Sequence, residues 1–182
     1  ILLTANNNYK KLIEQAKNFK AKNVIIKNKK FYLKVKKSLK KTKVYSGNVP
    51  LNKIISKKID YTMSAIVGVA GLQPTLDAIK NSKMVAIANK ESIISAWNII
   101  SKEIKKNKTK ILPVDSEHYS IKELTKGITD SEVEEIIITA SGGPFLNLPL
   151  NKLKKVKPKQ AIKHPNWKMG KKISTDSANL MN

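Results

Sequence analysis

The chain has 182 residues, 41% of them hydrophobic, which is enough for one folded core or for one domain and part of a second. It has no Cys and no apolar run long enough to cross a membrane, which excludes disulfides, thiolate chemistry and a spanning helix. The net charge of +23 comes from Lys alone, because Arg is absent, and this favours drift toward AT-rich codons over selection for reading nucleic acid.

Over the first 114 residues, short apolar runs alternate with segments whose apolar residues recur at helical spacing. The chain starts without a targeting segment and inside an apolar run, so we expect it to begin within a domain. The spacing of Phe31, Val35 and Leu39 predicts a basic amphipathic helix with a solvated Lys face. Strands are expected at 1–4, 24–26, 43–46, within 59–68, at 84–88 and at 110–114. Helices are expected at 9–20, around 31–39, at 50–56, at 72–80 and along a face formed by Ile93, Trp97, Ile100 and Ile104.

This order predicts an α/β fold with a parallel, Rossmann-like sheet covered by helices on both faces. The rhythm changes after Asp115, where we expect a strand at 133–139, a short helix at 151–156 and a loop over 163–172. We therefore predict a boundary between Val114 and His118, with an incomplete sheet domain over 1–114 and the start of an α+β domain over 115–182.

Polar segments follow four of the expected strands, at 3–8, 87–92, 114–118 and 139–145, and ligands bind at such strand ends in parallel sheets. In "VDSEH" an extended backbone would point Asp115 and Glu117 to the same side and His118 to the other. Two carboxylates directed at one point need a cation or a shared proton between them. A Lys partner is one reading, and a hard divalent ion such as Mg²⁺ or Mn²⁺ is the other.

Three further segments each allow a functional and a structural interpretation. The glycines of "SGGPF" expose backbone amides to an anion, or form a simple turn. In "STDSANLMN" Asp176 or Ser177 would cap a helix whose N-terminus could bind phosphate, or be a plain cap. In "HPNWKMG" Trp167 would lie in a lid over a ligand, or pack on the core.

The motifs "AIVGVAGLQPTLDAI", "ANKES", "LPVDSEH", "SGGPF", "HPNWKMGKKIS" and "DSANLMN" occur in the order found in 1-deoxy-D-xylulose 5-phosphate reductoisomerases. The chain resembles that family from about Leu2 to Asn182. The resemblance implies NADPH- and metal-dependent rearrangement and reduction of 1-deoxy-D-xylulose 5-phosphate to 2-C-methyl-D-erythritol 4-phosphate, for isoprenoid precursor synthesis. The implied cofactors are NADPH and Mg²⁺ or Mn²⁺.

The resemblance also assigns roles to individual residues. The metal ligands it implies are Asp115 and Glu117, the second also counted as catalytic. The substrate contacts it implies are Lys90, Ser116, Ser141, His164, Trp167, Ser177 and Asn182. Of these, Trp167 would lie in a lid loop over 163–172, and Ser141, Ser177 and Asn182 would surround the phosphate. The cofactor contacts it implies are Asn6, Asn7, Asn8, Asn89, Glu91 and Gly170. Many relatives have Gly where this chain has Asn6, and Asn tolerates a positive φ.

The family's Gly-rich cofactor fingerprint and the segment carrying a phosphate-binding Lys and a third metal-binding Glu fall outside these 182 residues. We therefore expect an internal fragment that is inactive by itself and belongs to a homodimer at full length. A bacterial cytoplasm is the expected location, with a plastid as the alternative. No membrane or nucleic-acid partner is expected. The competing interpretations are a basic module that binds nucleic acid through Lys, and a structural remnant.

Overall fold

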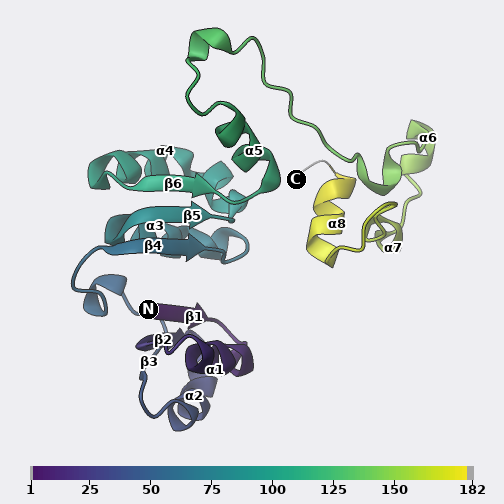
Figure 1. The fold of residues 1–182 in the computed structure, drawn as a ribbon. Coiled ribbons are helices and arrows are strands. Elements are labelled where there is room, and N and C mark those ends of the chain that lie inside the picture. The colour runs from purple at the N-terminus through teal and green to yellow at the C-terminus, as the bar shows by residue number, and fades with distance from the viewer. Residues whose placement is uncertain (1, 180–182) are drawn as a thin grey trace. The chain divides into compact units, whose positions relative to one another are not determined.

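The computed structural model describes residues 2–179, and the chain divides into two compact units, Ile1–Asp115 and Ser116–Asn182. The first unit consists of parallel strands with intervening helices, and the second of short helices joined by irregular segments (Figure 1). The α/β class predicted from the alternation of apolar runs is confirmed.

Six strands of the first unit form two parallel sheets of three, ordered β1–β2–β3 and β4–β5–β6. Parallel neighbours need a crossover connection, and the helices supply it. The strands are β1 (Leu2–Ala5), β2 (Asn23–Ile26), β3 (Lys43–Ser46), β4 (Ile59–Ser64), β5 (Ser82–Ile87) and β6 (Lys110–Pro113). The helices are α1 (Tyr9–Asn18), η1 (Lys29–Phe31), α2 (Tyr32–Ser38), η2 (Leu51–Lys53), η3 (Val69–Gly71), α3 (Leu72–Asn81) and α4 (Lys90–Asn107).

Each sheet of the first unit has its own hydrophobic cluster. Leu12 of α1 and Val35 of α2 pack against Val24 and Ile26 of β2, all four almost fully buried. The second cluster joins α3, β5 and α4 through residues that include Ile79, Val85 and Ile100. Burial of one such side chain stabilises the fold by about 1.5–3 kcal/mol, so these positions hold the strand ends in place.

The apolar face of α4 differs from the prediction at Trp97, whose side chain is 52% exposed. The backbone of Ala96 has non-helical angles, φ −147° and ψ 31°, which interrupt the 100° advance per residue on which the prediction relied. Ala96 is buried in place of Trp97, and Ile93, Ile100 and Ile104 keep their expected contact with the core.

The second unit consists of short elements around irregular backbone. They are α5 (Ser116–Leu124), η4 (Asp130–Glu132), η5 (Gly143–Phe145), α6 (Leu150–Leu153), α7 (Pro158–Ala161) and α8 (Lys171–Ala178). The strand predicted at 133–139 is wrong, because that segment pairs with no other strand among residues 2–179. Ile136, Ile137 and Ile138 are all more than half exposed there. A β-rich composition cannot form a strand without a partner backbone.

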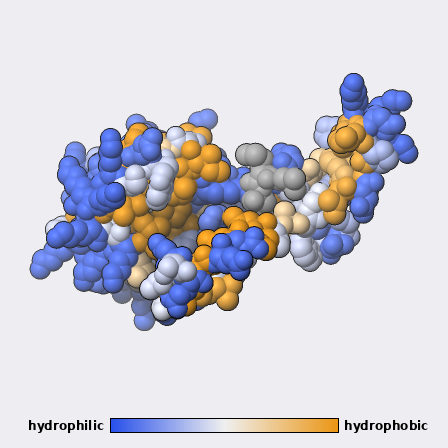
Figure 2. Space-filling model, turned by 90° about the horizontal axis from the view of Figure 1, so that it is seen from above, coloured by the Kyte–Doolittle hydropathy of each residue, from blue (hydrophilic) through white to orange (hydrophobic). Residues whose placement is uncertain are grey.

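Apolar side chains also remain at the surface of the first unit, including Tyr61 and Met63 on β4. In Figure 2 hydrophilic residues, drawn blue, alternate with orange apolar patches over the visible surface. Between Leu2 and Asn179, no helix is both long enough and apolar enough to cross a membrane.

Candidate functional site

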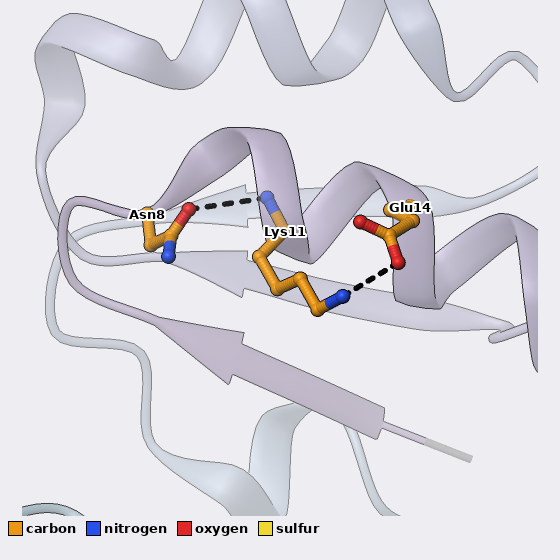
Figure 3. Close-up of polar contacts among 3 residues, drawn as sticks. All are labelled: Asn8, Lys11 and Glu14. Atoms are coloured by element: carbon orange, nitrogen blue, oxygen red, sulfur yellow. Dashed lines mark hydrogen bonds and ion pairs between the residues drawn. The ribbon is translucent and has the colours of Figure 1, made fainter.

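Three asparagines follow β1 at its carboxyl end, as the sequence predicts, and they are exposed. Oδ1 of Asn8 accepts the backbone N–H of Lys11 at 3.1 Å and caps α1, while Lys11 Nζ contacts Glu14 (Figure 3). Oδ1 of Asn7 accepts a hydrogen bond from Nδ2 of Asn28 at 2.8 Å. Asn6 is not among the residues with positive φ, so Asn at this position meets no left-handed strain.

Asn28 is a further polar residue at a strand end, which the sequence alone did not single out although it follows β2 closely. Its Oδ1 accepts the N–H of Lys30 and caps η1, and its amide group reaches Asn7. The carboxyl ends of β1 and β2 therefore form one polar surface, where the α1 N-terminus and Asn side chains offer hydrogen bonds to an anionic ligand.

Asn89 lies at the carboxyl end of β5 and is only 1% exposed. Its Oδ1 caps α4 by accepting the N–H of Ser92 at 2.6 Å. Its Nδ2 donates to the carbonyl oxygens of Ile66 and, at 2.9 Å, of Gly68. Both amide hydrogens of the side chain are thus used within the first unit, so a cofactor contact by Asn89 would have to use its backbone or the second lone pair of Oδ1.

Replacement of Asn89 by alanine is expected to destabilise the first unit by about 2–4 kcal/mol. The change leaves two carbonyl oxygens and one N–H without their hydrogen-bond partner. Each buried unsatisfied group costs about 1–3 kcal/mol before water or relaxation compensates. Urea denaturation followed by far-ultraviolet circular dichroism measures the loss. Asn98→Ala, an exposed position of the same helix, is the matched control. Equal stability of the two variants would contradict the anchoring role.

Lys90 and Glu91 form the first turn of α4 beside Asn89 and are half-buried. A carboxylate at this end of a helix is favoured by the helix dipole. The amino ends of β4 and β5 in the same sheet carry an exposed ion pair, in which Lys83 Nζ lies 2.8 Å from Asp60 Oδ1. The hydrogen bond from Lys83 and its positive charge lower the pKa of Asp60 below its ordinary value.

Asp115 and Glu117 do not lie on an extended segment, and the prediction that such a backbone points both to one side is wrong. Helix α5 begins at Ser116, so the two carboxylates flank its first residue. The signal overlooked was "DSE", which is typical of a helix start because polar caps and acids gather there. Ser116 Oγ donates to Glu117 Oε2 at 3.0 Å.

The donor set at Asp115 and Glu117 fits a hard divalent cation, because both side chains offer carboxylate oxygens. The two carboxylates do not make a complete site. In the described part of the chain, no group of three or more His, Cys, Asp or Glu side chains is placed so that it could hold a metal ion. His118 follows in α5 and is exposed.

Three predicted substrate residues meet within the second unit. Ser141 Oγ lies 2.7 Å from Ser177 Oγ and 3.0 Å from His164 Nε2. The His164 ring stacks on the Trp167 ring, with centroids 4.8 Å apart and planes inclined by 12°. Trp167 is nevertheless 58% exposed, so it does not pack into a core. The structure therefore joins the "SGGPF", "HPNW" and "DSAN" segments in one polar cluster.

The turn "SGGPF" requires glycine at two successive positions, with φ +73° at Gly142 and +64° at Gly143. A Cβ on Gly143 would lie 2.6 Å from the carbonyl oxygen of Ser177 and 2.8 Å from Cα of Ala178. Only a residue without a side chain lets this turn approach α8 so closely. This approach is what brings Ser141 to Ser177.

The prediction that Asp176 or Ser177 caps a helix is wrong. Helix α8 starts at Lys171, with Gly170 as its N-cap, so Ser177 lies in the last turn. No residue in 171–178 breaks the helix, and a Ser can lie inside a helix as well as at its N-terminus, so Ser177 did not mark where the helix begins. The irregular segment of the predicted lid loop thus ends at Gly170, where a Cβ would meet nothing within 4 Å. Asn182 lies outside the described residues.

Two family models match the sequence. One is described as 1-deoxy-D-xylulose 5-phosphate reductoisomerase and matches residues 1–97, and the other as the C-terminal domain of that enzyme and matches 111–182. A protein of that name from Pelagibacter ubique (strain HTCC1062) is 55% identical over 100% of this chain. One from Clostridium tetani (strain Massachusetts / E88) is 46% identical over 98% of it. The chain covers 48% of each, and so spans about half the length of the curated relatives it matches.

Solved structures with the same description match in three dimensions. The reductoisomerase from Zymomonas mobilis in complex with NADPH aligns with a TM-score of 0.88 at 40% identity, over 100% of this chain and 47% of that one. A reductoisomerase crystal structure in complex with NADPH, fosmidomycin and magnesium aligns with a TM-score of 0.80 at 34% identity, over 100% of this chain and 48% of that one.

Proposed function

The chain belongs to the 1-deoxy-D-xylulose 5-phosphate reductoisomerase family, and on that premise we propose that it forms the central part of such an enzyme. The full-length protein would rearrange 1-deoxy-D-xylulose 5-phosphate and reduce the product to 2-C-methyl-D-erythritol 4-phosphate, for isoprenoid precursors. NADPH would supply the hydride, and Mg²⁺ or Mn²⁺ would act as Lewis acid. The 182 residues alone would be inactive. The full-length protein would be a homodimer in a bacterial cytoplasm, with a plastid as the alternative.

The observation that carries this proposal is the polar cluster of the second unit. Ser141 lies 23 residues before His164 and 36 before Ser177, and yet its hydroxyl oxygen lies 3.0 Å from the Nε2 of the first and 2.7 Å from the Oγ of the second. Hydroxyl groups beside a Gly turn are suited to bind a phosphate group. The Trp167 ring covers His164 and is exposed, as a residue that closes over a substrate would be.

The other site residues support the proposal by position. Asp115 and Glu117 would hold the metal with their carboxylates, Ser116 would hydrogen-bond substrate, and Lys90 would meet its hydroxyl groups. Asn6, Asn7 and Asn8 would contact the adenosine 2′-phosphate, and Asn89, Glu91 and Gly170 other parts of the cofactor. We propose residues 1–114 as part of the cofactor domain and 115–182 as part of the catalytic domain, with Asn182 near the phosphate.

A chimera tests the function, because the chain covers only part of its relatives. This chain would replace the matching region of the Pelagibacter ubique protein, to which it is 55% identical. We expect NADPH consumption that requires both 1-deoxy-D-xylulose 5-phosphate and a divalent ion, followed by absorbance. A folded chimera that binds NADPH but consumes none would contradict the proposal.

Trp167 should report ligand binding in that chimera. A phosphonate hydroxamate that mimics the metal-chelating substrate would cover an indole that is now 58% exposed, and its fluorescence should shift to shorter wavelength. Trp97 is a second emitter, so the measurement uses a Trp97→Phe background, with Trp167→Phe as the blank. An unchanged spectrum at a ligand concentration where calorimetry shows saturation would argue against a lid.

A further inference from the structure

The ring of His164 receives two hydrogen bonds on one nitrogen. Nδ1 lies 3.1 Å from the backbone nitrogen of Asn166 and 3.1 Å from that of Trp167. A backbone N–H can only donate, so Nδ1 must accept and cannot carry a proton. The proton of the neutral ring is therefore on Nε2, since a hydrogen bond at one ring nitrogen decides which tautomer is present.

This tautomer sets the direction of the next hydrogen bond. Nε2 lies 3.0 Å from Ser141 Oγ, and because Nε2 carries the proton it donates and Ser141 accepts. The Ser141 hydroxyl hydrogen is then not needed by His164. One hydrogen is shared between Ser141 Oγ and Ser177 Oγ, which are 2.7 Å apart, and whichever hydroxyl supplies it, the other still has its own hydrogen.

The opposite tautomer would give the opposite result. If Nδ1 carried the proton, Nε2 would accept from Ser141, and Ser177 would have to donate to Ser141. Both hydroxyl hydrogens would then be used inside the cluster, and none would remain for a ligand. The two backbone N–H groups of 166 and 167 therefore control whether the serine pair can donate outward.

We propose that the turn at 164–167 locks the tautomer of His164, which frees one hydroxyl hydrogen of the Ser141–Ser177 pair for a phosphate oxygen. His164 is then a positioning residue that acts through Ser141. This inference deepens the proposed function and rests on it for the identity of the ligand. It also gives a selectivity: the cluster offers a hydrogen to an oxygen that only accepts, as in a phosphate dianion.

The residues around His164 and the serine pair support this arrangement of hydrogen bonds. Ser177 is only 4% exposed, and a hydrogen bond in such a poorly hydrated position is stronger than in water. The Trp167 ring covers the His164 ring, and so restricts the rotation that would exchange Nδ1 and Nε2. The Gly143 turn fixes the distance between Ser141 and α8.

The first test reads the tautomer directly on the 182-residue chain without ligand. Long-range ¹H–¹⁵N correlation spectra at mildly alkaline pH distinguish a protonated from an unprotonated ring nitrogen. We expect His164 to show a protonated Nε2 and an unprotonated Nδ1. His118 provides the second set of signals, and its loss in His118→Gln assigns the spectrum. An Nδ1–H tautomer, or an average of both, would overturn the proposal.

The second test uses two replacements that each keep one half of the ring's function. Gln places its amide near Nε2 and can still donate to Ser141, whereas Asn places its carbonyl near Nδ1 and can still accept from 166 and 167. With inorganic phosphate as the probe, amide shifts of 141 and 177 should give an affinity within about threefold of the parent for His164→Gln. His164→Asn leaves Ser141 without the N–H that it accepts, so the Ser141 hydroxyl is no longer oriented and polarised toward the ligand, and the affinity should fall by about tenfold or more.

Equal affinity of the two variants, or stronger binding by His164→Asn, would overturn the relay. So would the absence of any phosphate-dependent shift at 141 and 177 in the parent chain. The tautomer measurement needs no ligand and no turnover, so the two proposals fail separately. A correct tautomer in an inactive chimera would overturn the function alone, and an Nδ1–H tautomer in an active chimera would overturn the relay alone.

Discussion

Replacement of Asp115 by asparagine in the chimera is expected to lower turnover by more than about a hundredfold while leaving the NADPH dissociation constant nearly unchanged. Asn keeps the size of the side chain but removes one of the two carboxylate charges that flank the start of α5. The affinity of a divalent site follows its ligand charge. Loss of a residue that only supports a ligand already costs about 10–100-fold, so loss of a ligand should cost more. Calorimetry gives NADPH binding, and absorbance gives turnover.

Asp60→Asn is the matched control for this prediction. Asp60 is an exposed carboxylate at the amino end of β4, where it pairs with Lys83. Its replacement also removes one negative charge, but turnover should stay within about twofold, since this ion pair is fully exposed to water and contributes little. Raising the Mg²⁺ concentration should partly restore the Asp115 variant and have no effect on the control. Full turnover of the Asp115 variant at low Mg²⁺ would refute the metal assignment.

Replacement of Gly143 by alanine is expected to destabilise the second unit by about 3 kcal/mol or more and to separate Ser141 from Ser177. A left-handed conformation costs a residue with a side chain about 1–3 kcal/mol. The new Cβ would also lie 2.6 Å from the Ser177 carbonyl oxygen and 2.8 Å from Cα of Ala178, so the backbone of α8 or of the turn must move. Hydrogen exchange of the α8 amides measures the free energy of opening.

Two other glycines separate the conformational cost of a positive φ from the steric cost of the close approach to α8. Gly127 has φ +86° and open space around it, so Gly127→Ala should show only the conformational cost. Gly170 has φ −64° and open space, so Gly170→Ala should be close to neutral. We expect the loss of stability to increase from the Gly170 to the Gly127 to the Gly143 variant. Protection of α8 in Gly143→Ala equal to that in Gly127→Ala would show that the close approach has no energetic role.

The sequence by itself determined the element order of the first unit. Apolar residues recur at helical spacing in α1, as at Leu12 and Ala16, and at strand spacing in β2, as at Val24 and Ile26. Such spacing can be read from one segment alone, and in the folded chain these residues are buried. Polar residues such as Asn8 and Asn89 follow the strands directly, so the strand-end rule located them. The family motifs were also readable, because they depend on residue identity and order alone.

The sequence could not determine where side chains of the second unit point. The segment 133–139 has the composition of a strand, but pairing needs a second backbone, and none is present among residues 2–179. Ser177 was expected at a helix start and lies in the last turn of α8, because Gly170 caps that helix seven residues earlier. Caps and partners are contacts between segments, and the pattern of one segment does not contain them.

Tertiary structure alone decided the roles of Asn89 and His164. Asn89 reads as a strand-end polar residue that could meet a cofactor, yet its burial and its bonds to the carbonyls of Ile66 and Gly68 make it an anchor. His164 lies 23 residues from Ser141, and the tautomer that its Nδ1 contacts impose decides whether the serine pair can donate. Hydrogen-bond direction depends on atoms brought together by folding, so the sequence supplied the groups and the fold assigned each one as donor or acceptor.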